Sequence, residues 1–194
     1  KNLGGFGEGG LVTTGDADFA QRCRQLRNHG QTETYLHAYI GGNFRLDTLK
    51  AGILGVKLAR LGEFNAARRA HAARYDEMLG DLDGVRTPVV RPHNEMIYHQ
   101  YSILCARRDA LKAALAEAGI GSGIYYPVPL HRQPCFADLG YREGQLPVSE
   151  ESARRILALP IHPMLTDADI TRVGECIQKF YNAAPRSAAP AGAK

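Results

Sequence analysis

The first ten residues, KNLGGFGEGG, contain five glycines, and this segment restricts the fold more than any other part of the chain. Such a run cannot form a stable helix, but its backbone can adopt positive φ angles and approach a bound molecule closely. The apolar, β-branched stretch that follows, at 11–14, is typical of a strand. This order excludes a Rossmann dinucleotide fingerprint, because the glycine-rich loop of that motif follows its strand instead of preceding it.

The hydrophobic pattern changes character near residue 81. Before that point it predicts a helix over about 18–28, a loop over 31–45 and a long helix over about 46–78, with Gly62 as a candidate break. After that point it predicts strands at 85–90, 98–106 and 120–126, and helices at about 109–119, 149–159 and from Thr166 onward, the last with Asp169 in a capping box. Strands that alternate with helices in this half indicate a small α+β domain.

The composition is that of an ordinary globular protein, with 44% hydrophobic residues, 23% charged residues and a net charge of +4. No stretch approaches the roughly 20 apolar residues of a membrane helix, and the charge is too weak to indicate a membrane surface or a nucleic acid as partner. The four cysteines are far apart and the histidines lack a metal-ligand spacing, so no metal site is predicted. Reduced thiols and the lack of a signal peptide favour a cytoplasmic location.

Three groups of residues are candidates for chemistry, and each also has a plainer interpretation. Lys1 stands before the glycine-rich segment, where a lysine nucleophile could reach a carbonyl carbon, or it is simply an exposed lysine. Asn43 and Arg45 could bind a phosphate or carboxylate, or they could close a turn and solvate a helix start. The segment 125–134 is an extended, proline-fixed loop whose Tyr, His and Gln side chains would suit a sugar or nucleotide pocket, or a surface turn.

Taken together, six segments resemble the DegT/DnrJ/EryC1/StrS family of sugar aminotransferases that depend on pyridoxal 5'-phosphate (PLP), and they occur in the family's order. They are Lys1–Gly4, Gly7–Gly10 with the strand after it, Arg27–Gly30, Gly42–Asp47, Tyr126–Pro134 and Leu159–Pro163, and the resemblance extends to about residue 182. It implies an α/β fold of the aspartate-aminotransferase type (fold type I), with the end of the large domain followed by a small α+β C-terminal domain. We accordingly expect residues 1–64 to complete the PLP-binding large domain and form a bridging helix, 65–182 to form the small domain, and 183–194 to be a disordered tail.

The same resemblance implies roles for individual residues. Lys1 matches the lysine that binds PLP covalently and later shuttles a proton, with pyridoxamine phosphate as the intermediate form of the cofactor. Asn43 matches the asparagine that reaches the PLP phosphate of the neighbouring subunit, and Arg45 would face acidic groups of the nucleotide-sugar across the same interface. A homodimer with shared active sites follows. Tyr125, Tyr126 and His131 match the loop that lines the sugar pocket, and Gln133 is a further substrate-binding candidate.

The substrate that the resemblance implies is a nucleotide-linked keto-sugar, aminated at the expense of an amino acid such as glutamate. The segments 43–54, 100–103 and 125–134 are most similar to the branch that acts on UDP-3-keto-sugars for lipopolysaccharide, O-antigen and other surface polysaccharides. Related sequences often have His where Tyr125 stands, so a changed sugar contact is expected.

Other functions remain open at this point. A 4-keto-sugar or a cyclitol is an alternative substrate, and a non-catalytic fragment or partner is an alternative role. A PLP-dependent sugar dehydratase is disfavoured, because those relatives have histidine in place of the lysine. The family also places other PLP-binding residues upstream of the lysine, so we expect this sequence to be the downstream half of a longer protein.

Overall fold

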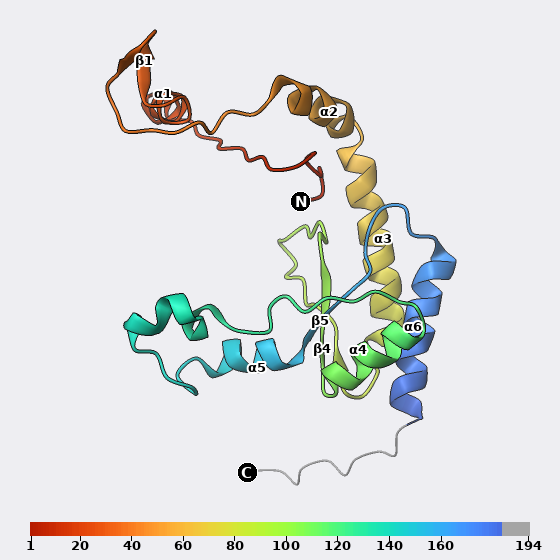
Figure 1. Ribbon diagram of the computed structural model, residues 1–194. Helices are drawn as coiled ribbons and strands as arrows, with labels where there is room; N and C mark the ends of the chain where they lie inside the picture. Colours follow the sequence, from red (N-terminus) through yellow and green to blue (C-terminus); the bar gives the residue numbers. More distant parts are fainter. Residues whose placement is uncertain (184–194) are drawn as a thin grey trace. The chain divides into compact units, whose positions relative to one another are not determined.

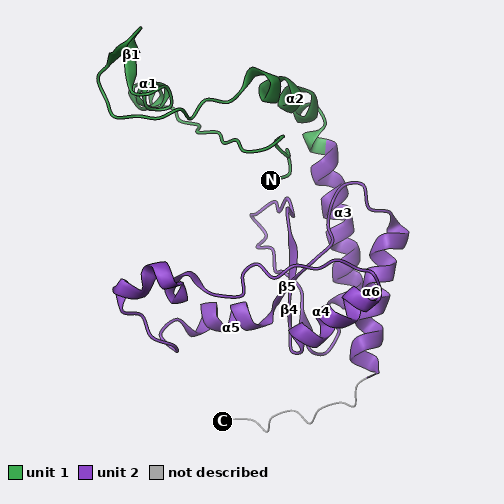
Figure 2. Ribbon diagram, viewed as in Figure 1, with its two compact units in different colours: residues 1–62 green, residues 63–194 purple. Residues whose placement is uncertain are grey.

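The computed structural model describes residues 1–183, which divide into two compact units, 1–62 and 63 onward (Figures 1 and 2). The tail predicted at 183–194 lies, apart from Ala183, outside the described residues. No helix in the described part of the chain is both long enough and apolar enough to cross a membrane.

The first unit contains two helices and a short hairpin. Helix α1 (Ala17–Leu26) begins where the Asp16 carboxylate accepts a hydrogen bond from the backbone N–H of Phe19, at 3.0 Å. Strands β1 (Gln31–Glu33) and β2 (Leu36–His37) pair antiparallel, and α2 (Thr48–Leu58) follows. The hairpin lies inside the region predicted to be a loop. The sequence does not predict it, because strands of two or three residues are too short to show an alternating hydrophobic pattern.

The second unit packs helices on a small antiparallel sheet. Helix α3 (Leu61–Leu79) leads into a sheet of order β3-β4-β5, formed by β3 (Val85–Arg86), β4 (Tyr101–Cys105) and β5 (Ile156–Leu159). Between β4 and β5 lie α4 (Arg108–Glu117), the 3-10 helices η1 (Leu130–Arg132) and η2 (Pro134–Leu139), and α5 (Pro147–Arg155). Helix α6 (Asp167–Asn182) ends the described chain. Figure 1 shows α3, α4 and α6 grouped beside the sheet.

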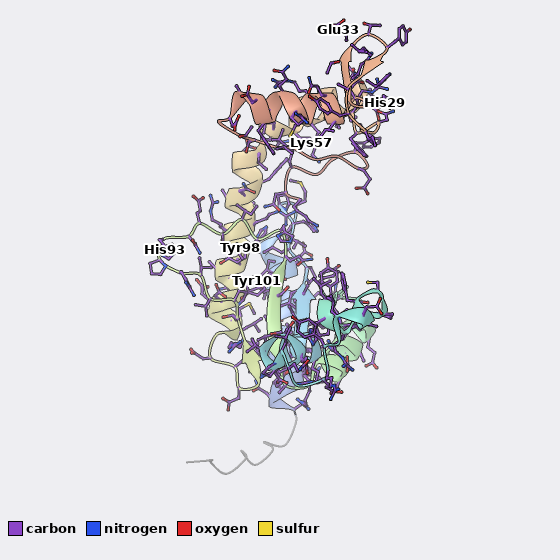
Figure 3. All side chains as sticks on the ribbon, turned by 90° about the vertical axis from the view of Figure 1, so that its left-hand side faces the viewer. His29, Glu33, Lys57, His93, Tyr98 and Tyr101 are labelled. Atoms are coloured by element: carbon purple, nitrogen blue, oxygen red, sulfur yellow. The ribbon has the colours of Figure 1, made fainter. Side chains whose placement is uncertain are left out.

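The hydrophobic core of this unit lies between the sheet and those three helices. Central strand β4 alternates buried and half-buried side chains, and its buried positions meet apolar residues of α3, α4, β5 and α6. Tyr101 is fully buried next to Tyr98 (Figure 3), and its hydroxyl donates to the Asp76 carboxylate at 2.5 Å. Burial, together with this bond, raises the pKa of Tyr101, so the phenol stays a neutral donor.

Five of the predicted helices and strands differ from the observed ones. The strand predicted at 85–90 covers only Val85–Arg86. Residues 11–14 and 120–126 form no strand; in the second segment only Gly123 makes a bridge, to Ala158. The helix predicted over 46–78 is two helices, separated at Ala59–Arg60 instead of at Gly62. The helix predicted over 149–159 ends at Arg155, and its last part is β5, which pairs with β4. For residues 156–159, pairing with β4 decides the outcome, whereas the exposed residues 11–14 have no strand partner.

Candidate active site

Lys1 lies at the head of a tight backbone turn in the first unit. Its carbonyl accepts from the N–H of Gly4 at 3.0 Å, and Gly4 has a φ of 67°, which favours glycine. The Lys57 ammonium on α2 donates to the Gly4 carbonyl at 2.7 Å. Lys50, two turns earlier on the same face of α2, donates to the Glu8 carbonyl at 3.4 Å. Helix α2 therefore holds the glycine-rich segment in place, while the Lys1 side chain remains exposed.

Asn43 is set by a close crossing of two backbone segments. Asn28 and Asn43 form an antiparallel bridge, which is flanked by hydrogen bonds from the N–H of His29 to Gly42 at 2.9 Å and from the N–H of Phe44 to Arg27 at 2.9 Å. Gly30, at a φ of 70°, lies so close to the next segment that an added Cβ would be 1.7 Å from the Tyr39 carbonyl oxygen. The motifs 27–30 and 42–47 are thus one structural unit.

The same crossing orients the two polar side chains that the sequence singles out. The Arg45 guanidinium donates to the side-chain oxygens of Asn43, at 3.0 Å, and of Asn28, at 3.2 Å. Because the Asn43 oxygen accepts this bond, its side-chain N–H groups are the donors that an external phosphate would meet. Asn43 and Arg45 are brought together, and Asn28 is a supporting residue that the sequence did not suggest.

The four loop residues of the prediction belong to the second unit, where a cleft of about 440 Å³ opens between the loop and α5. Tyr125, Tyr126 and Gln133 line this cleft, with Ser149 and Ser152 of α5 on the other wall. The two tyrosine rings meet edge to face at 5.7 Å and are partly exposed. Their hydroxyls, with the serine and glutamine groups, give an apolar hollow several hydrogen-bonding groups, as a sugar requires.

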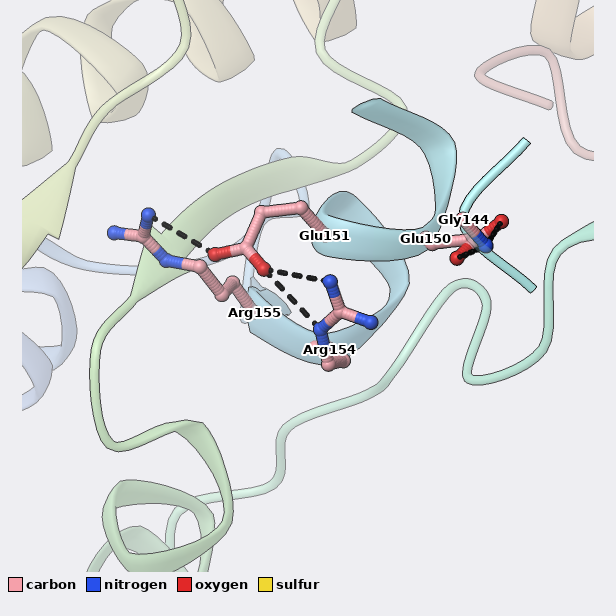
Figure 4. A network of polar contacts seen from close by, with 5 residues as sticks. All are labelled: Gly144, Glu150, Glu151, Arg154 and Arg155. Atoms are coloured by element: carbon pink, nitrogen blue, oxygen red, sulfur yellow. Dashed lines mark hydrogen bonds and ion pairs between the residues drawn. The ribbon is translucent and has the colours of Figure 1, made fainter. Parts of the chain in front are cut away.

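His131 does not line the cleft. Its side chain is only 6% exposed, and its Nε2 lies 3.1 Å from a carboxylate oxygen of Glu150, which is equally buried. Figure 4 shows this carboxylate held by the backbone of Gly144. Those backbone bonds first, and the His131 bond after them, hold the pKa of Glu150 below its ordinary value, so it is an anion at neutral pH.

Glu150 and Lys57 were not identified from the sequence. A signal for Glu150 exists: it shares a spacing of three with the buried Ala153, which places a charge on the inner face of α5. No signal marks Lys57, because a lysine near the end of an exposed helix is ordinary. Among residues 1–183, no cluster of His, Cys, Asp or Glu could hold a metal ion.

Comparison with known proteins places these features in a family. The DegT/DnrJ/EryC1/StrS aminotransferase family matches residues 1–178. A "pleiotropic regulatory protein" of Geobacillus stearothermophilus is 45% identical over 93% of the chain and 49% of its own length. A UDP-N-acetyl-3-dehydro-α-D-glucosamine 3-aminotransferase of Acidithiobacillus ferrooxidans is 41% identical over 92% of the chain and 48% of its own length. Other relatives are named as transaminases of dTDP-linked sugars.

The solved structures agree with the sequence comparison. The crystal structure of Streptomyces venezuelae DesV in complex with a ketimine intermediate matches with a TM-score of 0.93 and 39% identity, over 95% of this chain and 50% of that one. The chain therefore belongs to the DegT/DnrJ/EryC1/StrS aminotransferase family, and it spans about half the length of the curated relatives it matches. The predicted α/β fold of the fold-type-I aminotransferases is confirmed, and the enzymes of this family depend on PLP.

Proposed function

We propose that this chain carries the lysine-bearing part of a PLP-dependent aminotransferase that acts on a nucleotide-linked keto-sugar. The observation that carries the proposal is Lys1, an exposed amine on a turn fixed by Gly4 and Lys57, at the first residue of the family match. A nucleophilic lysine needs a fixed backbone and free space around its amine, and this turn provides both.

The residues of the first unit fit the cofactor. When bound, PLP acts as an electron sink for the carbanion formed at the amino donor. Lys1 Nζ would hold the cofactor covalently and, when free, would move the proton from the Cα of the donor. The N–H groups of Asn43 would bind the phosphate, because Arg45 holds the amide with its oxygen turned inward.

The keto-sugar would occupy the cleft of the second unit. Tyr125, Tyr126 and Gln133 line it and would bind sugar hydroxyls, while Arg45 of the partner subunit would bind acidic groups of the nucleotide-sugar. Relatives named for UDP-linked and for dTDP-linked sugars are equally similar, at 41% identity. We favour a UDP-3-keto-sugar, glutamate as donor and a place in surface-polysaccharide synthesis, with a 4-keto-sugar as the alternative. The protein would act in the cytoplasm.

The first test is covalent capture of the cofactor on Lys1. The purified protein, incubated with PLP and reduced with borohydride, should gain the mass of one phosphopyridoxyl group on the peptide that contains Lys1. Lys1→Ala and Lys1→Arg should lose this label and lose turnover by at least the 10²–10⁴-fold typical of a proton-transfer group. A Lys1→Ala protein that still turns over a keto-sugar would refute the role of Lys1.

The second test addresses a homodimer with shared active sites. If Asn43 acts on the PLP of the neighbouring subunit, Lys1→Ala and Asn43→Ala would each impair both sites of their own dimer. Mixed dimers would keep one site with an intact lysine and an intact asparagine, so an equal mixture should recover roughly a quarter of the wild-type activity. A mixture no more active than its components, with subunit exchange shown by mass, would mean that Asn43 does not act across an interface.

The name of the Geobacillus relative favours a second candidate, a regulatory protein without catalysis. It predicts that the protein neither retains PLP nor forms the borohydride adduct, so the first test also separates these two functions.

A further inference from the structure

Glu150 is the most fully bonded carboxylate in the described part of the chain. Its two oxygens accept from the backbone N–H of Gly144 at 3.0 and 2.8 Å, and one of them also meets the N–H of Leu146 at 3.4 Å and the His131 ring at 3.1 Å. The side chain is 6% exposed, so these bonds replace its hydration. A carboxylate buried in this way is costly to leave unpaired.

The bonds join η1 to α5 and to the turn that immediately precedes α5. His131 belongs to η1, Gly144 and Leu146 belong to the turn before α5, and Glu150 itself belongs to α5. Leu146 is the N-cap residue of α5, and its side chain makes no capping hydrogen bond. The Glu150 carboxylate instead accepts from the N–H of Leu146 and so fixes this turn. The His131 ring also packs edge to face against Tyr141, at 5.8 Å.

The joined segments are the walls of the sugar cleft. Leu130 and Gln133 flank His131 and line the cleft from the loop side, and Ser149 and Ser152 flank Glu150 and line it from α5. Thus the two partners of the buried pair are neighbours, in the chain, of residues that line the two opposite walls.

We propose that Glu150, through His131, is a positioning residue that holds the loop 125–133 against α5 and so sets the shape of the keto-sugar cleft. This inference rests on the proposed function for its substrate, but its structural part can be measured without activity. Glu150 would not touch the sugar; it acts on the residues that do.

The structural arm of the test is limited proteolysis at two exposed arginines: Arg132, at the end of the loop 125–133, and Arg142, just before the Gly144–Leu146 turn. Glu150→Gln keeps the size and shape of the side chain. It replaces one acceptor oxygen by an NH2 group, which cannot accept from the backbone N–H groups of Gly144 and Leu146. Trypsin cleavage at these two sites should become roughly tenfold faster, the scale of losing one charge-assisted hydrogen bond. Glu151→Gln is the matched control: this neighbour on α5 is half-exposed and pairs with Arg154 and Arg155 (Figure 4). Its cleavage rate should stay within about twofold of wild type.

His131→Leu is a second variant that tests the same contact if the Glu150 variant fails to fold. It removes the link to η1 and the ring contact with Tyr141 but leaves the Gly144 and Leu146 bonds, so cleavage after Arg132 should accelerate more than cleavage after Arg142. If Glu150→Gln folds and is cleaved at the rate of Glu151→Gln, or if His131→Leu is cleaved at the wild-type rate, the positioning role is refuted.

The kinetic arm separates positioning from general destabilisation. In Glu150→Gln, the KM for the nucleotide-linked keto-sugar should rise roughly tenfold, while the half-reaction with the amino acid, followed by cofactor absorbance, proceeds at the wild-type rate. Equal effects on both half-reactions would overturn the assignment to the sugar cleft. A third outcome separates the two proposals: the loop opens in Glu150→Gln, but the wild-type protein aminates no keto-sugar. That result would refute the proposed function, while the role of Glu150 in holding the loop would be retained.

Discussion

At the scale of single residues, the tightest constraint in the first unit is a glycine. Gly30 combines a φ of 70° with the closest backbone approach of the described chain, 1.7 Å from a built Cβ to the Tyr39 carbonyl oxygen. Gly41 faces the same crossing from the other side, where a Cβ would lie 2.4 Å from the Gly30 nitrogen. Asn43 is positioned by this crossing, so two residues without side chains determine where the amide proposed to bind the phosphate lies.

This geometry predicts a severe effect of Gly30→Ala. The Cβ cannot fit without moving the backbone of 39–43, so the free energy of unfolding should fall by about 4 kcal/mol or more, and PLP should be retained less well. Gly140→Ala is the control, because Gly140 has a similar φ of 72° with nothing within 4 Å of a built Cβ. It should lose only about 1 kcal/mol, the cost of the left-handed conformation alone. Urea unfolding of both variants measures the difference, and equal losses would show that the crossing is not a tight one.

At the scale of elements, the sequence predicts best what its local chemistry determines. Helix α6 begins as expected, because the Thr166 hydroxyl accepts from the N–H of Asp169 at 3.2 Å while the Asp169 carboxylate accepts from the N–H of Thr166 at 2.8 Å. The carboxylate bonds lower the pKa of Asp169, the Thr166 side chain contributing most. Helix α1 begins as expected for a similar reason, at Asp16.

The elements that the sequence predicts poorly are those that depend on partners distant in the chain. Residues 156–159 continue an apparently helical pattern, yet they form β5 because β4 offers a free edge to an apolar run that stops at Pro160. Residues 120–126 have suitable apolar side chains, but Gly121, Gly123 and the prolines at 127 and 129 leave a single bridge. Local pattern cannot tell these two outcomes apart, since both segments are short and apolar.

The residues of the candidate site also differ in whether the sequence alone indicates them. Lys1, Asn43 and the tyrosine pair were found because they occur in motifs whose residue types and order are specific. Lys57 acts on a backbone carbonyl 53 residues away and Glu150 on a backbone N–H six residues before it, and backbone acceptors and donors leave no mark on a sequence. His131 was found through its motif, but only the structure reveals that its ring faces Glu150 and not the cleft.

At the scale of the whole molecule, the two units differ in whether they can bury a core. The second unit has a continuous cluster of buried apolar side chains from α3, the sheet, α4 and α6. In residues 1–62, all of them described, Gly30 is the only buried residue, and the side chains of Leu49, Val56 and Leu58 on the apolar helix α2 are more than half exposed. Apolar burial supplies most of the free energy of folding, so only the second unit has the means to fold alone.

This contrast predicts different behaviour for the two pieces expressed separately. Residues 61–183, which keep α3 whole, should unfold cooperatively in urea with a free energy of roughly 5 kcal/mol, near the lower end for small domains, because the core cluster is internal to them. Residues 1–62 should show no cooperative transition and little fixed near-UV circular dichroism, since the entropy of ordering them is not offset by burial. A cooperative transition in the 1–62 piece would mean that its exposed apolar helix finds a partner within those 62 residues or in a second copy. Repeating the measurement over a hundredfold range of concentration distinguishes the two, because only self-association makes the transition depend on concentration.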